Sequence, residues 1–232
     1  APLDGPTDLV IDAHRRIADA RGETWDVRIA ARDALALVAE GVRLDRYADD
    51  APASPDGGDG ALPNGVRALV DAVVQPAATV VVRNGRVASV ELGESGAKGV
   101  AVGAAGDGHG ALVGAALAEP DVFATLNDAF AAEPVVVDVP AGVVVPGPVV
   151  VVHVTEGDGV AAFPRLVVRA GDDSEVSVLE IQASGAGAAL VVPVTEILVG
   201  RAARVGHVTV QQLGLATWQL GLQVSLVGAE AT

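Results

Sequence analysis

The residues that could do chemistry in this chain are four histidines and the acidic side chains, because the 232-residue sequence contains no cysteine. Thiolate metal ligands, thiol nucleophiles and disulfides are therefore excluded within the chain. Metal or acid–base chemistry would depend on His14, His109, His153 and His207 and on nearby carboxylates.

Two of the histidines lie in expected strands. His153 ends the apolar run VVVVHV without a carboxylate or second histidine at ligand spacing, so we interpret it as a packed or hydrogen-bonded edge residue. His207, Thr209 and Gln211 alternate and should point to one face, which is either a solvated outer surface or a polar row facing a partner. Neither pattern predicts a metal site.

The other two histidines lie outside the strands. His109 stands in the glycine-rich stretch GDGHGA, which lacks the Lys-Ser/Thr ending of a phosphate-binding loop, and we interpret it as a flexible loop. His14 lies beside Arg15 and Arg16 on an expected helix, which indicates a solvated face.

Three glutamates raise an enzymatic alternative. Glu175, Glu180 and Glu196 could pair as acid and base, as in β-helix polysaccharide lyases and hydrolases. No Arg or Lys cluster for an acidic sugar accompanies them, so structural or exposed carboxylates are the preferred interpretation. Two carboxylates meeting in a groove on one face would favour the enzyme.

The composition limits the partners. Acidic residues number 30 against 15 basic ones, with Lys98 the single lysine, and the formal net charge is −15. Nucleic-acid binding needs clustered Lys and Arg, which the sequence lacks. The N-terminal stretch APLDGPTDLV is no secretory signal, and Pro and Gly interrupt the apolar runs, so we predict a cytoplasmic protein without membrane spans.

Periodicity divides the chain into four parts. We predict an N-terminal helical region over 1–48, with helices near 8–20 and 24–41, and a Pro-, Gly- and Asp-rich linker over 49–65. A short helix ended by Pro76, a hairpin and a Gly-rich connection fill 66–119. A β-helix domain, entered by a capping helix, covers 120–232.

The hairpin and the capping helix have specific signals. Asn84 and Gly85, in VVVRNGRVASVEL, supply the positive φ of a type I′ turn. Pro120 and Asp121 begin a helix with Val122, Leu126 and Phe130 on one stripe.

From Val135 onward the helical period gives way to short valine-rich runs separated by Gly, Pro and Asp. The absence of crossover helices leaves two fold classes, a β-sandwich and a β-solenoid. Recurring units of apolar run, Gly corner and alternating strand, as in VVRAGDDSEVSVLE and ILVGRAARVGHVTV, favour a right-handed parallel β-helix.

The motifs of residues 78–226 resemble the SufB/SufD family of iron–sulfur cluster assembly proteins. The resemblance is carried by a Phe-x-x-Leu-Asn-x-Ala-Phe helix, a Val-Pro-x-Gly-Val corner, a Pro-Arg strand and two later strands with Glu, His and Gln. The matching residues, interpreted as structural or interface positions, are Asn84, Gly85, Arg86, Phe123, Leu126, Asn127, Ala129, Phe130, Val139, Pro140, Gly142, Val143, Pro148, Pro164, Arg165, Gly171, Val178, Glu180, Thr195, Glu196, Gly200, Ala203, His207 and Gln211.

The resemblance implies a scaffold that is not itself an enzyme. The Asn-Gly hairpin, the missing cysteine and the N-terminal helices favour a SufD-like subunit, whereas the SufD phrase around Trp25 is only partly kept. The family implies a SufB-like partner, a SufC-like ATPase and an iron–sulfur cluster at the level of the complex. No cofactor is expected to bind directly, a homodimer through β-helix edges is an alternative assembly, and we expect further coils beyond Thr232. For Arg165 we expect hydrogen bonds to corner carbonyls.

Overall fold

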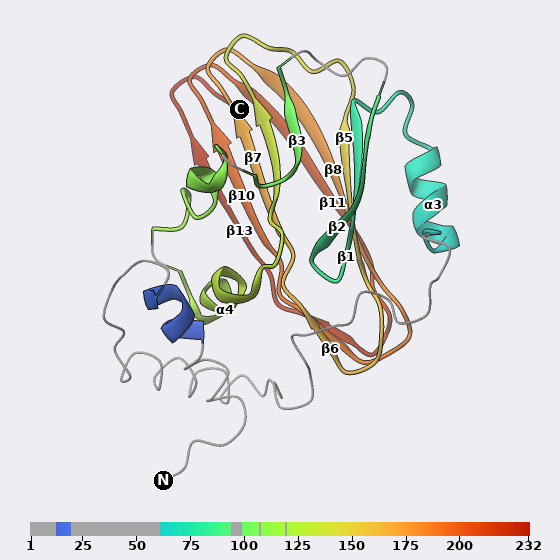
Figure 1. Ribbon diagram of the computed structural model, residues 1–232. Helices are drawn as coiled ribbons and strands as arrows, with labels where there is room; N and C mark the ends of the chain where they lie inside the picture. The colour runs from blue at the N-terminus through green and yellow to red at the C-terminus, as the bar shows by residue number, and fades with distance from the viewer. Residues whose placement is uncertain (1–12, 20–60, 94–98, 107, 119) are drawn as a thin grey trace.

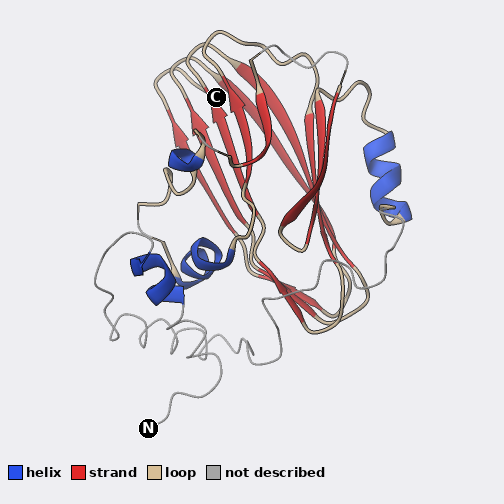
Figure 2. Ribbon diagram, viewed as in Figure 1, coloured by secondary structure: helices blue, strands red, loops and turns tan. Residues whose placement is uncertain are grey.

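The computed structural model describes residues 13–19, 61–93, 99–106, 108–118 and 120–232. These residues form a parallel β-solenoid whose strands stack into three sheets (Figure 1 and Figure 2). The predicted mainly β fold is confirmed as a solenoid. The sandwich alternative is wrong, because successive coils pair in parallel rather than as antiparallel hairpins.

Each coil of the solenoid contributes one strand to each sheet. The strands in chain order are β4 (Val135–Val139), β5 (Val149–Thr155) and β6 (Val160–Ala162) in the first coil, β7 (Arg165–Ala170), β8 (Glu175–Ser184) and β9 (Ala189–Val191) in the second, β10 (Val194–Val199), β11 (Arg204–Gln212) and β12 (Thr217–Gln219) in the third, and then β13 (Leu222–Val227). Arg165 pairs with Val194 and Val194 with Leu222, so one coil takes 29 or 28 residues.

The corners of the coils divide two runs that the sequence shows as continuous. Residues 189–200 form β9 and β10 on either side of Val192 and Pro193, and residues 217–226 are split between β12 and β13 at Gly221. A Cβ atom on Gly221 would lie 2.8 Å from the Pro193 ring, so these two corners stack closely on successive coils. Proline and glycine therefore set where the sheets change.

Valine and alanine fill most of the interior between the sheet of β4, β7 and β10 and the sheet of β5 and β8. The inward residues of this apolar core are Val135, Val137, Val139, Val149, Val151, Leu166, Val168, Ala170, Val176, Val178, Ile197 and Val199. Small and β-branched side chains suit this place because each one packs against its counterparts on the coils above and below.

The first coil is bordered by antiparallel strands. β1 (Ala78–Arg83) pairs in parallel with β5 and antiparallel with β2 (Arg86–Leu92), and β3 (Ala101–Ala104) pairs antiparallel with β4. The predicted hairpin is confirmed, with positive φ values of 48° at Asn84 and 78° at Gly85. The hairpin is thus continuous with the solenoid sheet, and the division at residue 120 stays a prediction.

Helix α3 (Asn64–Asp71) covers the outer face of β5 and β8, where Val66 packs with Val150, Val152 and Ile181. We expected this helix to continue to Pro76, but its last residue is Asp71. The β-branched Val73 and Val74 and the restricted residue before Pro76 disfavour another turn.

Helix α4 (Val122–Phe130) has the predicted position and begins with Asp121, whose Oδ1 accepts a hydrogen bond of 2.8 Å from the Ala124 amide. The prediction that α4 caps the open end of the solenoid is wrong. Asn127 Nδ2 donates to the carbonyls of Pro164 and Val192, which lie at the same corner of successive coils, at 2.8 Å each. The helix therefore lies along the side of the solenoid (Figure 1).

Part of the predicted N-terminal helical region can be compared with the structure. Residues 13–19 are helical, Ala13 packs with Leu126 of α4, and the Arg16 guanidinium lies 4.8 Å from the centre of the Phe130 ring. The predicted helix at 24–41 and linker residues 49–60 lie outside the described residues.

Candidate functional site in the solenoid interior

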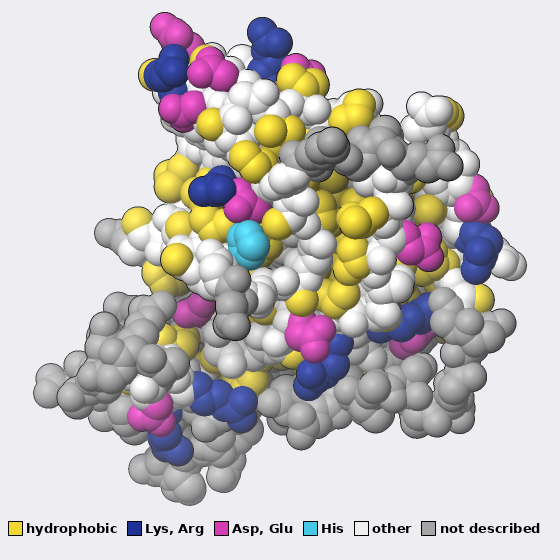
Figure 3. All heavy atoms as spheres, turned by 45° about the horizontal axis from the view of Figure 1, so that its top comes forward, with side chains coloured by type: hydrophobic (Ala, Val, Ile, Leu, Met, Phe, Trp, Pro, Cys, Tyr) yellow, Lys and Arg dark blue, Asp and Glu magenta, His cyan; other side chains and the backbone are white. Residues whose placement is uncertain are grey.

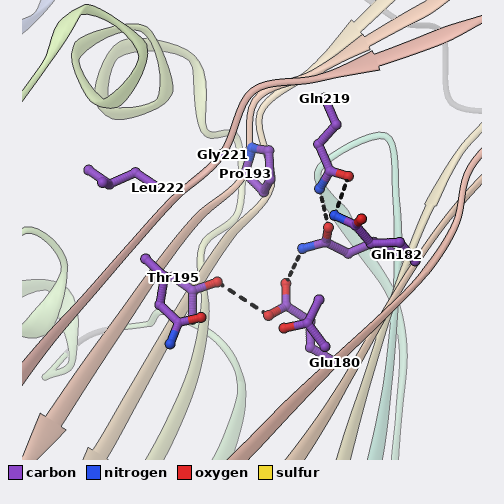
Figure 4. A pocket seen from close by; sticks show the side chains of 10 residues that line it. Glu180, Gln182, Pro193, Thr195, Gln219, Gly221 and Leu222 are labelled. Carbon is purple, nitrogen blue, oxygen red and sulfur yellow. Dashed lines mark hydrogen bonds between the residues drawn. The ribbon is translucent and has the colours of Figure 1, made fainter.

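The interior changes from apolar to polar along strands β8 and β11. On β8, Val176 and Val178 belong to the apolar core, and the next inward position, two residues on, is Glu180. Beyond it a cavity of about 290 Å³ opens among ten residues from five strands and two corners (Figure 4). They are Glu180, Gln182, Pro193, Thr195, Thr209, Gln211, Gln219, Gly221, Leu222 and Gln223.

Glu180 is the centre of this polar region and its side chain is 2% exposed. Its Oε1 accepts a hydrogen bond of 2.7 Å from Gln182 Nε2, and its Oε2 accepts one of 3.2 Å from Thr195 Oγ1 (Figure 4). His207 Nε2 lies 3.0 Å from the same Oε2. Uncharged and imidazole donors, rather than an arginine or lysine, therefore compensate the burial of this carboxylate.

Two histidines approach Glu180 from neighbouring strands. The strand register places Glu180 opposite Val151 on β5 and Thr209 on β11, so His153 is two positions further along β5 and His207 two positions back on β11. His153 Nε2 lies 3.6 Å from Glu180 Oε1. The three side chains thus form a diagonal across the inner face of three coils, and the side chains of both histidines are 6% exposed.

Burial and neighbouring groups act against each other at this diagonal. Burial lowers the pKa of His153, and the negative charge of Glu180 opposes that shift only in part. Burial alone would raise the pKa of Glu180, but the hydrogen bonds from His207 and Gln182 hold the pKa of Glu180 below its ordinary value. Glu180 is therefore an ionised carboxylate in the interior.

A series of amides connects Glu180 with the cavity. Gln211 Nε2 donates to Gln219 Oε1 at 2.8 Å, Gln219 donates to Gln182 Oε1, and Gln182 donates to Glu180. Each amide both donates and accepts, so the series can respond to a change at Glu180 by reorienting. The site combines a fixed charge with adaptable neighbours.

Two sequence-based interpretations of this region hold only in part. His207, Thr209 and Gln211 share a face, and Thr209 and Gln211 are exposed where they line the cavity, but the His207 side chain is buried against Glu180. His153 is packed, as one alternative predicted, but it is not isolated and its ring nitrogens form no hydrogen bond. Its carboxylate and second histidine come from other coils, which local spacing could not reveal.

The glutamates considered for catalysis do not meet. Glu180 faces inward, Glu175 pairs at the surface with Arg204 at 3.6 Å, and Glu196 faces outward under the segment that contains Gly114 and Ala116. The groove that would have favoured a carbohydrate-active enzyme is therefore not formed by these three carboxylates.

Arg165 is a structural anchor, as expected, but it binds carboxylates rather than corner carbonyls. Its Nε and Nη2 donate to Glu196 Oε1 at 3.0 and 2.7 Å, and its Nη1 donates to Asp128 at 3.0 Å. Glu196 also accepts from the amides of Gly114 and Ala116. This cluster ties α4 and residues 114–116 to the outside of β7 and β10.

The other motif residues of the resemblance have structural contacts. Asn84 holds the end of β5, since its Nδ2 donates to the Glu156 carbonyl and its Oδ1 accepts from the Glu156 amide. Phe130 lies 5.3 Å from Phe163, while Phe123 and Leu126 pack in the same cluster. Pro140 and Gly142, with a φ of 73° at the glycine, form the turn after β4.

Some functional classes find no support in the described residues. No group of three or more His, Asp or Glu side chains within them has ready-made metal-ligand geometry. His109 lies 3.5 Å from Asp138, which also binds Arg169, so its nearest polar partner is a carboxylate of this chain. On the face shown in Figure 3, the described Arg side chains are scattered among Asp and Glu without a basic patch. None of the described helices is long and apolar enough to cross a membrane.

A comparison with known protein families identifies the solenoid. Residues 153–232 match the family described as "SUF system FeS cluster assembly, SufBD core domain". This match covers about a third of the chain and supports its membership of the SufB/SufD family. The matched range starts at His153 and includes Glu180, His207 and all of the second and third coils, so the candidate site lies within the SufBD core. No curated protein matches the chain.

Proposed function

We propose that this chain is a SufD-like scaffold subunit of the SufB/SufD family that works with a SufB-like partner and a SufC-like ATPase in the cytoplasm. The observation that carries the proposal is the SufBD core match over the stacked coils, which supports a role in SUF iron–sulfur cluster assembly. The SufD-like role is supported by the missing cysteine and by the Asn84–Gly85 hairpin.

A scaffold without its own ATP chemistry agrees with the sequence. The single lysine, Lys98, is followed by Gly99 and not by Ser or Thr, so the chain lacks the Lys-Ser/Thr ending of a phosphate-binding loop. Because the chain has no cysteine, thiolate ligands for a cluster under assembly would come from the SufB-like partner. The cluster is then the product of the complex and not a resident cofactor of this subunit.

Strand edges offer a physical means of association. β2 is an edge strand of its five-stranded sheet within the described residues, and its Val90 and Leu92 are 40% and 72% exposed. An edge of this kind can accept a strand from another chain through main-chain hydrogen bonds. Strand addition is thus a route to the SufB-like partner and equally to a homodimer.

Co-expression tests the proposal. The chain is produced with the SufB-like and SufC-like proteins of the same genome, and the mixture is analysed by size-exclusion chromatography with light scattering. We expect a complex that contains all three proteins. Failure of the chain to co-elute with either partner would overturn the scaffold role, and a homodimer that excludes both would replace it with self-association.

Two further measurements test whether β2 forms the contact with the partner and whether the chain itself hydrolyses ATP. Val90→Asp combined with Leu92→Asp should weaken the complex if β2 supplies the edge, whereas the control Arg67→Asp on helix α3 should leave the complex unchanged. The purified chain should hydrolyse no ATP on its own. ATP turnover by the isolated chain would contradict a non-catalytic role.

A further inference from the structure

His153 is the side chain in the described part of the protein whose hydrogen-bonding groups are least satisfied. Its Nδ1 and Nε2 are both buried without a hydrogen-bond partner there, and Asn127 Oδ1 is the one other such side-chain atom. A buried neutral imidazole ordinarily donates from one nitrogen and accepts at the other. An imidazole buried with neither interaction is arranged for a partner that the protein chain does not supply.

The group that faces this imidazole is a carboxylate oxygen with a free acceptor position. Glu180 Oε1 accepts one hydrogen bond, from Gln182, whereas Oε2 is engaged by both Thr195 and His207. A carboxylate oxygen has two lone pairs, so Oε1 keeps one for a further ligand. His153 Nε2 is 3.6 Å from that oxygen, too far for a hydrogen bond.

We propose that His153 Nε2 and Glu180 Oε1 bind a divalent first-row transition-metal ion. Imidazole nitrogen and carboxylate oxygen lie about 2.0–2.2 Å from such an ion, so two ligand atoms 3.6 Å apart can share one ion with an angle of roughly 120° between the bonds. The ionised carboxylate supplies charge, and the neutral imidazole supplies a lone pair.

Neighbouring residues complete the site. His207 does not ligate the ion. It holds Oε2 and thereby orients the carboxylate, in the way that ligating carboxylates are usually supported by outer hydrogen bonds. Glu180, although not His153, also lines the cavity of about 290 Å³, which offers an ion and its water molecules a route to the carboxylate. With two protein ligands the site would bind an exchangeable ion rather than a permanent structural one.

This proposal does not rest on the SufD-like role, and it is tested on the purified full chain. Zn²⁺ is titrated by calorimetry and Co²⁺ by visible absorption, and we expect about one ion per chain. His153→Leu and Glu180→Gln should each weaken binding at least tenfold and should remove any rise in melting temperature caused by Zn²⁺.

A second histidine–carboxylate pair provides the matched control. His109 Nε2 lies 3.5 Å from Asp138, but the His109 side chain is 31% exposed and the Asp138 carboxylate also binds Arg169. His109→Leu should leave the affinity unchanged. Binding that is lost in His109→Leu and kept in His153→Leu would overturn the proposal, and so would the absence of saturable binding to the unmodified chain.

A measurement without a destabilising variant guards against misfolding. Long-range ¹H–¹⁵N spectra of the unmodified chain report on each imidazole, and His153 is assigned by comparison with variants of the other three histidines. Zn²⁺ should shift the His153 Nε2 resonance first. A shift confined to His14 or His109 would show that the ion binds at the surface and would overturn the proposal.

Discussion

Two glutamates on adjacent sheets, Glu180 and Glu196, are equally buried but have opposite surroundings. Glu196 is 0% exposed and lies outside the solenoid, held by the permanent cation of Arg165 and by two backbone amides. Glu180 is 1% exposed and lies inside, surrounded by neutral amides, a hydroxyl and two imidazoles. Glu196 therefore has the partners of a structural anchor, whereas Glu180 has partners that can exchange protons or reorient.

The difference matters because a solenoid interior is normally made of repeated apolar layers. The valines of β5 and β8 follow this rule up to Val178, and the change at Glu180 removes stabilising apolar contacts from the centre of the fold. Polar groups placed there without a structural need indicate a function, whereas Arg165 and Glu196 have one, which is to hold α4 and residues 114–116 against the coils.

Removing the charge of Glu196 should have the largest effect. Glu196→Gln places an amide NH₂ near the buried Arg165 guanidinium and leaves the partly exposed Asp128 as the remaining carboxylate partner of that cation, so we expect a loss of about 3 kcal/mol in the free energy of unfolding. Urea denaturation measures it. Glu175→Gln is the control, because its pair with Arg204 is half-exposed and should contribute about 0–1 kcal/mol. Equal effects of the two substitutions would contradict an anchoring role for Glu196.

The same substitution inside the solenoid should be milder. In Glu180→Gln the neighbouring Gln182 amide can flip and His207 can change tautomer, so most hydrogen bonds re-form and the loss should be about 1–2 kcal/mol. Glu180→Leu offers no acceptor to its three donors and should cost more than Glu180→Gln in the same urea experiment. If Glu180→Gln were as damaging as Glu196→Gln, the contrast between an anchor and an adaptable site would be wrong.

The sequence predicted those structural elements that depend on residues close together in the chain. The Asn84–Gly85 turn, the start of α4 at Asp121 and the valine-rich strands all follow from residues close together in the chain. The corners that split the runs at Pro193 and Gly221 were missed, since a solenoid corner is set by contact with the next coil. The lateral position of α4 was missed because Asn127 finds its two acceptors on separate coils.

The candidate site could not be predicted because its members meet only through the coil register. His153, Glu180 and His207 are each 27 residues apart, two fewer than the 29-residue separation of facing residues on β5, β8 and β11. Because inward side chains recur every two residues, each site residue lies one inward position earlier on its strand than the site residue of the preceding coil. This shift produces the diagonal. The sequence did contain a signal, which is the equal spacing of three titratable residues at nearly the length of one coil. This spacing can be recognised only when the length of the coil is already known.

Acidic pH should separate the inner site from the outer anchor. Burial lowers the pKa of His153 in the folded chain below its ordinary value of 6.5. As the pH drops below about 6.5, the unfolded chain therefore takes up a proton on His153 that the folded chain does not, and the free energy of unfolding decreases. Glu180, whose pKa is held below its ordinary 4.5, stabilises the fold above about that pH and ceases to do so as the pH falls further.

Urea midpoints at pH 7.5, 6.5 and 5.5 test the histidine contribution. His153→Leu removes the titrating group, so its midpoint should fall less over this range than that of the unmodified chain. Parallel pH profiles for the two proteins would show that His153 titrates alike in the folded and unfolded states, and the interior would then not be dry enough to disfavour its charge.

The smallest expected effect comes from a single donor to Glu180. Thr195→Val keeps the shape of the side chain but removes the hydroxyl that donates to Oε2 at 3.2 Å, and we expect a loss of about 0.5–1.5 kcal/mol in urea denaturation. Thr195→Ser retains the hydroxyl and should recover part of that loss. In a Glu180→Gln background the acceptor is uncharged and Gln182 and His207 can reorient, so Thr195→Val should reduce the free energy of unfolding by less than it does in the unmodified chain. A loss of the same size in both backgrounds would mean that Thr195 contributes by packing alone and that Glu180 does not organise its neighbours.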